Sequence, residues 1–387
     1  MSNHRRYPVL HLNKVLSSAK KGDSLSIDEI RFLLQLTDKK DIHNLFRAAR
    51  ELRQQHFDNT VFLYGFVYFS TWCRNDCFFC FYRKSNCVAP RYRKSKSEII
   101  QIARKLSESG VHLIDLTMGE DPFYYQSSQS FLELAELVKE IKKEIGLPVM
   151  ISPGVVPNNT LEVLARAGAD WYACYQETHN RVLFNRLRTQ QNYDERLNRK
   201  MDARQLGLLI EEGILTGIGD RPNDIVVSIQ AMRIIGAHQV RVMSFVPQRG
   251  TPLQHLSRPP LQRELIIIAV LRLLFPDRLI PASLDVEGIK GLRSRLDAGA
   301  NVITSLVPPD NGLLGVSQNS LDIEEGYRTP KGVSPILIEL GLRPGTRTEY
   351  DRWMSSFRKE RNILTDFTSV RTYQDRVAKG QSGFMPS

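Results

Sequence analysis

The stretch VFLYGFVYFSTWCRNDCFFC, residues 61–80, joins an apolar run to a loop that carries three of the five cysteines of the chain. The run Leu63–Phe69 consists largely of aromatic and β-branched residues, which predicts a β-strand. Cys73, Cys77 and Cys80 follow it directly, with the spacing C-x3-C-x2-C. Cysteines this close together, in a chain without a disulfide framework, indicate a metal site on the loop after the first strand.

An apolar run followed by a longer amphipathic stretch recurs as far as residue 307. The runs predict eight strands: Leu63–Phe69, Leu113–Thr117, Val149–Ile151, Trp171–Tyr175, Leu215–Ile218, Val240–Phe245, Leu279–Leu284 and Val302–Thr304. Helices are expected between them, for example at Glu98–Glu108, Phe131–Glu144, Asn159–Ala167, Asp194–Glu212 (closed by Gly213) and Leu261–Phe275. Strands that alternate with helices pair in parallel through right-handed crossovers. Eight strands favour an α/β fold closed into a (β/α)8 TIM barrel, with an open, doubly wound sheet as the alternative.

Helical signals precede the barrel, and the composition changes after it. Ser26, with Glu29 three residues on, predicts a capping box at the start of a helix, and a second helix is expected over Ile42–His56. A further helical piece is expected at Ser334–Gly341. We therefore expect an N-terminal helical extension over residues 1–60, the barrel over 61–307, and a C-terminal extension with a flexible tail over 308–387.

The composition is that of an ordinary globular protein. Hydrophobic residues make up 42% and charged residues 25% of the 387 residues. The formal net charge of +11 means that anionic partners have to be considered. No apolar run reaches the ~20 residues of a membrane span, and the first residues lack the apolar segment of a secretion signal. We expect a cytoplasmic protein in a reducing environment, without a membrane partner.

Three closely spaced thiolates are typical of an iron–sulfur cluster with one open position. A 4Fe-4S cluster offers four irons, of which Cys73, Cys77 and Cys80 would hold three. The alternatives are a fourth ligand from Cys87, a zinc site, or buried structural cysteines. Structural zinc usually takes ligands from paired C-x2-C motifs, and the sequence has no second pair. Cys174, inside the fourth apolar run, is expected to be a core residue.

The motif C-x3-C-x-aromatic-C after the first strand, with Phe79 as the aromatic residue, resembles that of the radical S-adenosylmethionine (SAM) enzymes. This resemblance implies a 4Fe-4S cluster held by Cys73, Cys77 and Cys80, with S-adenosyl-L-methionine bound to the open iron. It further implies a 5′-deoxyadenosyl radical as the first reactive species. A reducing electron donor such as a flavodoxin or ferredoxin is then needed.

Further residues resemble the biotin synthase and hydrogenase-maturase branch of these enzymes. Glu177 in YQETHN and Arg196 in YDERL match residues that bind, respectively, the ribose hydroxyls and the methionine carboxylate in that branch. Both roles suit the chemistry of a carboxylate and of a guanidinium. Gly119 and Glu120 stand where the branch has G-G-E, with Met in place of the first glycine, and are expected to meet the methionine amino group. Ser152, at the end of the third predicted strand, is a further cofactor-binding candidate.

A narrower resemblance, from about residue 61 to residue 352, is to the methylornithine synthases of pyrrolysine biosynthesis. It rests above all on the stretches IDLTMGEDP (114–122), SLDVEGIKGL (283–292) and NVITSLVPPDNGLLGVSQNSLDIEEG (301–326). The resemblance implies an isomerase of the lysine mutase type that converts L-lysine to 3-methylornithine. Hydrogen abstraction by the radical would be followed by fragmentation and recombination of the carbon skeleton.

Charged residues at the predicted strand ends suit a small zwitterion with two amines. A buried charge costs several kcal/mol unless it is paired, so a lysine site needs a guanidinium and carboxylates. We expect Arg241 and Ser283 to bind the lysine carboxylate and Asp115 and Asp285 to bind its amines, roles that the resemblance to the methylornithine synthases also implies. The alternative is an internal Asp115–Arg241 salt bridge without a ligand.

Other functions fit parts of the sequence. The basic run over residues 83–96 suggests RNA modification, although the sequence shows no appended RNA-binding module and we expect no nucleic-acid partner. A cofactor-assembly role, as in hydrogenase maturases, would share Glu177 and Arg196 without needing the four substrate residues. An electron carrier without catalysis is the last alternative, and a complete barrel argues against it.

Overall fold

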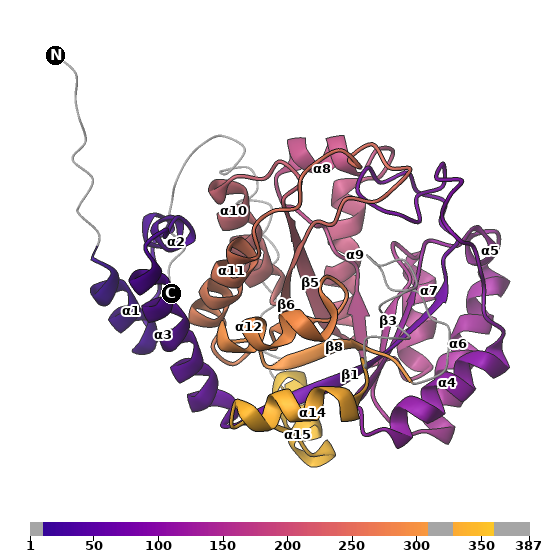
Figure 1. The fold of residues 1–387 in the computed structure, drawn as a ribbon. Helices are drawn as coiled ribbons and strands as arrows, with labels where there is room; N and C mark the ends of the chain where they lie inside the picture. The colour runs from indigo at the N-terminus through magenta and orange to yellow at the C-terminus, as the bar shows by residue number, and fades with distance from the viewer. Residues whose placement is uncertain (1–10, 309–327, 360–387) are drawn as a thin grey trace.

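Parallel strands follow one another around a barrel in the order of the sequence (Figure 1). The computed structural model describes residues 11–308 and 328–359. The barrel strands are β1 (Thr60–Ser70), β2 (Leu113–Met118), β3 (Val149–Ser152), β4 (Trp171–Ala173), β5 (Leu209–Thr216), β6 (Gln239–Ser244), β7 (Pro281–Ser283) and β8 (Val302–Leu306). β1 pairs with β2 on one side and with β8 on the other. An isolated bridge joins Gln239, at the start of β6, to Leu279, two residues before β7, so the barrel is nearly closed.

Helices connect the strands and cover the outside of the barrel. They are α4 (Lys96–Glu108), α5 (Pro122–Tyr125), α6 (Ser128–Glu144), α7 (Asn158–Arg166), α8 (Arg181–Leu187), α9 (Tyr193–Gln205), α10 (Pro222–Ile235), α11 (Leu261–Leu274), the 3-10 helix η1 (Gly288–Gly291) and α12 (Leu292–Asp297). Because β8 lies beside β1 and the two ends of the sheet approach each other at the Gln239–Leu279 bridge, the sheet forms a nearly closed ring, which confirms the predicted (β/α)8 barrel over the open sheet. No helix among the described residues is long and apolar enough to cross a membrane.

The fifth strand begins earlier than predicted. The helix expected over Asp194–Glu212 ends at Gln205, because Gly207 with φ +87° turns the chain out of the helix. β5 therefore covers Leu209–Thr216 instead of Leu215–Ile218, and Gly213 lies inside the strand.

The wrong boundary has a physical reason. Glu211 and Glu212 read as the polar face of a helix, whereas both are fully buried in β5 and paired with cations. Charged residues in a strand with both faces buried occur only where partners compensate them. The partners come from distant parts of the chain, so the local pattern does not reveal them.

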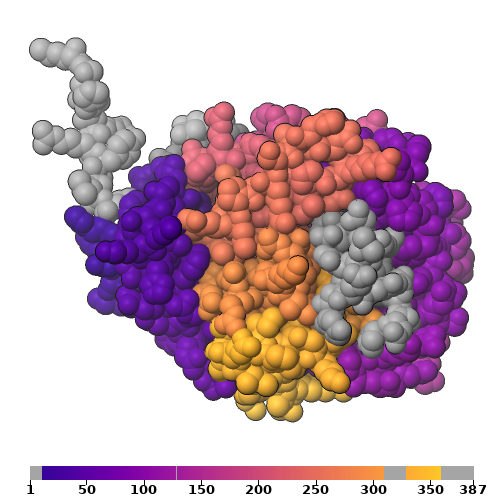
Figure 2. All heavy atoms as spheres, in the orientation of Figure 1, coloured from indigo at the N-terminus to yellow at the C-terminus, as the bar shows by residue number. Residues whose placement is uncertain are grey.

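Three helices precede the barrel: α1 (Leu12–Lys20), α2 (Ile27–Leu34) and α3 (Lys39–Phe57). Ser26 and Glu29 form the predicted capping box at the start of α2, and α3 includes the helix expected over Ile42–His56. These helices, indigo in Figure 2, pack against α11 on one side of the barrel.

The C-terminal segment covers the amino ends of the strands. α14 (Pro330–Glu339) confirms the helix expected at Ser334–Gly341, and it is followed by the short strand β9 (Arg343–Pro344) beside β1 and by α15 (Arg347–Lys359). On α15, the hydroxyl of Tyr350 hydrogen-bonds with that of Tyr64 at 2.7 Å, and Trp353 stacks on Trp171 with 5.8 Å between ring centroids. The expected flexible tail lies outside the described residues.

Truncation of Tyr350 tests whether aromatic packing holds α15 against the amino ends of the strands. Its ring is fully buried against Phe62, Tyr64 and Trp353. We expect Tyr350→Ala to lower the free energy of unfolding by about 3–5 kcal/mol, as for other large buried aromatic residues. Tyr350→Phe keeps the ring and loses one hydrogen bond, so it should cost about 1 kcal/mol. Denaturant titrations measure both values, and equal losses would show that ring packing does not hold α15 to the barrel.

Candidate active site

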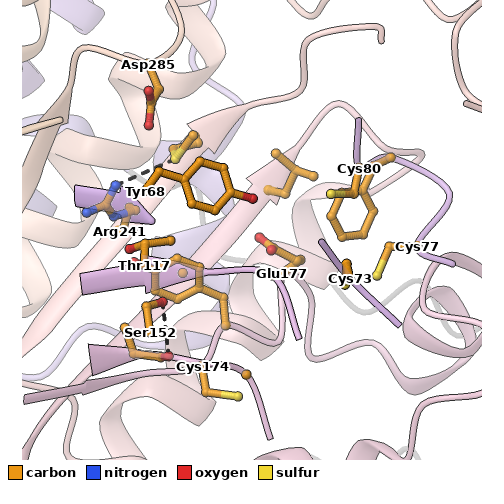
Figure 3. A pocket seen from close by; sticks show the side chains of 18 of the residues that line it. Tyr68, Cys73, Cys77, Cys80, Thr117, Ser152, Cys174, Glu177, Arg241 and Asp285 are labelled. Carbon is orange, nitrogen blue, oxygen red and sulfur yellow. Dashed lines mark hydrogen bonds between the residues drawn. The ribbon is translucent and has the colours of Figure 1, made fainter. Parts of the chain in front are cut away.

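A cavity opens at the carboxyl ends of the barrel strands, the end at which barrel enzymes bind their substrates. Most of the residues predicted for the site line it: Cys73, Cys77, Phe79, Cys80, Asp115, Gly119, Glu120, Ser152, Glu177, Arg196, Arg241 and Asp285. Figure 3 shows the three cysteines at one end of this cavity, Arg241 and Asp285 at the other, and Glu177 between them. Ser283 is buried nearby but is not one of the lining residues.

The other two cysteines lie apart from the three of the motif. Cys87 is exposed, and its thiol lies 3.7 Å from the carbonyl oxygen of Ser85, outside the cavity wall. The structure therefore offers no support for Cys87 as a fourth ligand. Cys174 belongs to the buried core, as predicted, and it also lines the cavity at the end of β4.

Hydrogen-bond donors surround the sulfurs of the motif. The backbone N–H of Asn75 donates to Cys73 Sγ at 3.5 Å, while Gln191 Nε2 and Arg188 Nη1 donate to Cys77 Sγ at 3.0 and 3.5 Å. Donors of this kind favour the thiolate, which is the form that binds iron. Burial raises the pKa of Cys73 to about 11, so ionisation of this thiol depends on the metal that it would bind.

The cysteine arrangement fits a 4Fe-4S cluster better than one zinc ion. Thiolates that share a tetrahedral zinc ion have their sulfurs about 3.8 Å apart. Among residues 11–308 and 328–359, no three His, Cys, Asp or Glu side chains surround one point closely enough to hold a single ion. Gly119 brings β2 up to the loop, since a Cβ there would lie 2.3 Å from Trp72 O and 2.9 Å from Cys73 Cβ. Three cysteines that line one end of the cavity without converging on a single point suit a cluster, which is larger than an ion.

Glu120 positions Arg196 beside the cysteine loop. Its Oε1 accepts from Arg196 Nη1 at 3.3 Å, and its Oε2 accepts from Arg74 Nε at 3.0 Å. Burial alone would raise the pKa of Glu120, but Arg196 and the backbone N–H of Val155 outweigh it and hold the pKa below its usual value. Arg196 also donates through Nε to the carbonyl of Tyr175 at 2.8 Å. Its Nη2 makes no hydrogen bond within the described part of the chain and can meet a ligand carboxylate.

Glu177 reaches the cavity from a strained backbone. Its φ of +65° is rare for residues other than glycine, and such strain is concentrated at functional sites. Oε1 accepts from Arg188 Nη2 at 2.8 Å. Burial raises the pKa of Glu177, and the cations Arg188 and Arg196 offset this only in part. Hydrogen-bond donors from a ligand would therefore stabilise the ionised carboxylate.

Arg241 is paired with a residue that the sequence pattern placed in a helix. Its Nε donates to Glu211 Oε1 at 2.6 Å, and both side chains are buried. The guanidinium also lies over the ring of Tyr175, 5.7 Å from the centroid. Among the described residues no ion pair joins Arg241 to Asp115, so the alternative of an internal bridge between these two is not what the structure shows.

Asp115 is buried and forms no ion pair with any cation of the described residues. It lies midway along β2, and its hydrogen-bond partner is Thr117, whose hydroxyl donates to Oδ1 at 2.8 Å. Burial and the nearby charge of Glu211 raise the pKa of Asp115 to about 7, although Thr117 and Arg241 lower it in part. An ammonium group placed beside this carboxyl would favour its ionised form.

Asp285, in contrast, already has partners in the protein. Arg328 Nη2 donates to Oδ1 at 3.0 Å, and the hydroxyl of Ser305 donates to Oδ2 at 2.8 Å. Arg328 is fully buried and lies just before α14. The backbone N–H of Asp285 donates to the hydroxyl of Ser283 at 3.3 Å, so Ser283 supports the turn that carries Asp285.

Among the described residues, the charged groups at this end of the cavity leave one carboxylate without an ion-pair partner. Glu211 is paired with Arg241 and Asp285 with Arg328, whereas Asp115 is paired with neither guanidinium. With all five groups ionised, the set carries one net negative charge. A ligand with one net positive charge would balance this negative charge. The free-energy cost of burial in the cavity would therefore be lowest for such a ligand.

The basic run over residues 83–96 is largely used within the protein. Arg83 pairs with Asp76, Arg93 with Asp121 and Lys96 with Glu140. Arg91 donates to the backbone carbonyls of Thr71, Tyr82, Arg83 and Asn86. The run is therefore not a row of unpaired cations for phosphates, which removes the main reason for considering RNA.

Four residues that contact the predicted site residues are not indicated by the sequence pattern: Arg188, Gln191, Glu211 and Arg328. Glu211 and Arg328 become recognisable only through partners that are distant in sequence. Arg188 and Gln191 lie between the two residues of the branch motif, Glu177 and Arg196, and this position could have drawn attention to them.

The chain is similar to several proteins of known name. Residues 67–231 match the family model of the radical SAM superfamily. The chain is 44% identical over 331 residues to the 3-methylornithine synthase of Methanosarcina barkeri, with 86% of this chain and 93% of the relative covered. It is 32% identical over 273 residues to the FeFe-hydrogenase maturase subunit HydE of Thermotoga maritima, with coverages of 70% and 77%. A crystal structure of a methylornithine synthase aligns with a TM-score of 0.83 and 43% identity, covering 88% of this chain and 99% of that one.

The isolation of Asp115 predicts that Asp115→Asn stabilises the protein without ligand. Because the pKa of Asp115 lies above that of an unfolded Asp, ionisation of this group lowers the stability of the folded state as the pH rises from about 4 to about 7. The variant lacks this penalty, so its free energy of unfolding should exceed that of the parent at pH 8, by at most about 4 kcal/mol. At pH 5.5 the gain should be about half as large. Denaturant titrations at both pH values test this, and a gain independent of pH would contradict it.

Proposed function

Because the chain belongs to the radical SAM superfamily and, within it, to the family of the 3-methylornithine synthases, we propose that it converts L-lysine to 3-methylornithine. Substrate and product have the same atoms, so the enzyme would be an isomerase that rearranges a carbon skeleton. Its product would enter pyrrolysine biosynthesis. A reducing donor of one electron, such as a flavodoxin or ferredoxin, would serve as its partner.

The observation that carries this proposal is the unpaired carboxylate of Asp115. Lysine at neutral pH has two ammonium groups and one carboxylate, and therefore one net positive charge. The residues Asp115, Glu211, Asp285, Arg241 and Arg328 have one net negative charge when ionised. Charge balance in a buried site supports a substrate of this class over a neutral or anionic one.

Cys73, Cys77 and Cys80 would hold the cluster, and the cavity beside them would hold SAM. Together these groups would supply the radical chemistry that removes hydrogen from the substrate. Arg196, held by Glu120 and the carbonyl of Tyr175, would turn Nη2 to the methionine carboxylate. Glu177 would accept hydrogen bonds from the ribose hydroxyls through the oxygen that Arg188 does not occupy. Phe79, Gly119, Glu120 and Ser152 would complete the wall around SAM.

The residues at the other end of the cavity would orient lysine. Arg241 would bind the substrate carboxylate with the guanidinium nitrogens that Glu211 leaves unused. Asp115 would bind one ammonium group and Asp285 the other, while Ser283 acts through the turn of Asp285. Fixing both charged ends holds the carbon chain between them close to the radical source, and closeness and orientation lower the barrier. The barrel walls keep water from the reacting carbon.

Turnover by the reconstituted protein tests the proposal directly. Protein loaded with iron and sulfide under anaerobic conditions is incubated with SAM and a reductant, with or without lysine. We expect lysine to increase formation of 5′-deoxyadenosine or SAM consumption and to yield an isomer of the same mass. If 5′-deoxyadenosine forms at one rate in both samples and no isomer appears, lysine is not the substrate.

Arg241→Ala should lower kcat/KM for lysine about 100-fold or more. The substitution removes the guanidinium that would bind the lysine carboxylate, and it leaves Glu211 buried without its cation. Visible absorbance and iron content of the reconstituted variant should match those of the parent, because Arg241 lies at the far end of the cavity from the cysteines. Loss of the cluster would instead give Arg241 a structural role. Ile338→Ala, at an exposed position on α14, serves as the control.

A further inference from the structure

We propose that Gln191 raises the reduction potential of the cluster through a hydrogen bond to Cys77, which assumes the cluster of the proposed function but not lysine as the substrate. Gln191 is half-buried in the turn between α8 and α9. Its Nε2 lies 3.0 Å from Cys77 Sγ, a close approach for a nitrogen donor and a sulfur acceptor.

The surroundings fix which end of the amide faces the sulfur. Gln191 Oε1 lies 3.3 Å from Arg188 Nη1 and 3.3 Å from Arg196 Nη1. Guanidinium groups only donate hydrogen bonds, so the atom that faces both of them has to be the oxygen. The NH2 group is then directed at Cys77. A flipped amide would place its NH2 group against the N–H groups of both guanidiniums and would leave Cys77 Sγ without this donor.

The turn that carries Gln191 is fastened to the cysteine loop. The backbone N–H of Phe78 donates to the carbonyl of Leu187 at 2.8 Å, and the hydroxyl of Thr189 donates to the carbonyl of Asp76 at 3.3 Å. Gln190 has φ +65°, a strained conformation that persists only where the surrounding structure holds it. Both flanks of Cys77 are therefore tied to the turn, which sets the distance from the amide to the sulfur.

A donor at this sulfur favours the reduced cluster. Reduction adds one negative charge, which is spread over the irons and sulfurs, so a hydrogen bond to a ligand sulfur strengthens on reduction. Arg188 Nη1, 3.5 Å from the same sulfur, acts in the same direction. Reduction of the cluster is the step that any electron donor has to perform, and Gln191 would make it easier.

The same amide also supports SAM binding, and two variants separate these roles. Gln191→Leu removes both the donor to Cys77 and the acceptor for Arg196. Gln191→Glu keeps an acceptor for the guanidinium groups but has no donor for the sulfur. Gln101→Leu, at an exposed position on α4, makes the same change of residue type far from the motif and serves as the control.

The midpoint potential is measured on the reconstituted full-length protein without SAM or lysine, by redox titration followed by electron paramagnetic resonance. At the midpoint of the parent, the ratio of reduced to oxidised cluster should fall about tenfold in both variants, a change of 59 mV for one electron. SAM affinity should weaken about fivefold in Gln191→Leu alone. The control should match the parent in both measurements.

Two results would overturn the proposal. The first is a midpoint potential of Gln191→Leu and Gln191→Glu equal to that of the parent. The second is failure of both variants to hold iron, because a donor that tunes a cluster is not needed to retain it on three thiolates. Because the titration contains no lysine, its outcome is independent of whether lysine is the substrate.

Discussion

A charge buried in the mouth of a barrel needs a partner of opposite sign, and this requirement organises the whole cavity. Removing a charge from water costs several kcal/mol, which only a close counter-charge and further hydrogen bonds offset. The structure provides such pairs in Glu120 with Arg196, Glu177 with Arg188, Glu211 with Arg241 and Asp285 with Arg328. Asp115 departs from this pattern. In an otherwise balanced site, an unpaired carboxylate is the feature most directly explained by a cationic ligand.

Strained backbone at the cavity goes together with dense aromatic packing at the other end of the barrel. Glu177 and Ser305 line the cavity and have positive φ values, as does Gln190 in the turn between α8 and α9. At the amino ends, α15 covers the barrel with stacked aromatic rings, and Asp58, just before β1, also has a positive φ. Stability supplied by such packing allows unfavourable backbone geometry where side chains have to be aimed at ligands.

The sequence was most informative where local patterns decide the structure. The eight apolar runs predicted the barrel, and the cysteine spacing identified the loop that lies at its functional end. Local patterns failed where charge pairing decides the structure. Glu211 and Glu212 appeared to continue a helix, and only the positions of Arg241 and Lys200, from other strands and helices, show why they are buried. Arg328, which compensates Asp285, follows a long segment without a periodic pattern, and nothing near it in sequence indicates a role.

The ion pair of Lys200 and Glu212, which lies behind the cavity, helps to explain how the unpaired carboxyl of Asp115 can persist inside it. Lys200 binds Glu212 and also donates to Cys174 O at 3.1 Å and to Gln176 Oε1 at 3.0 Å, while Glu212 accepts from the backbone N–H of Gln176 at 2.8 Å. Burial would raise the pKa of Glu212, but Lys200 and His179 hold it at about 2, so this carboxylate stays ionised beside Lys200. It fixes the residue directly before Glu177 and the strand that carries Glu211. A layer of this kind keeps the cavity from collapsing around Asp115, whose carboxyl is relieved either by protonation, as its raised pKa allows, or by a cation.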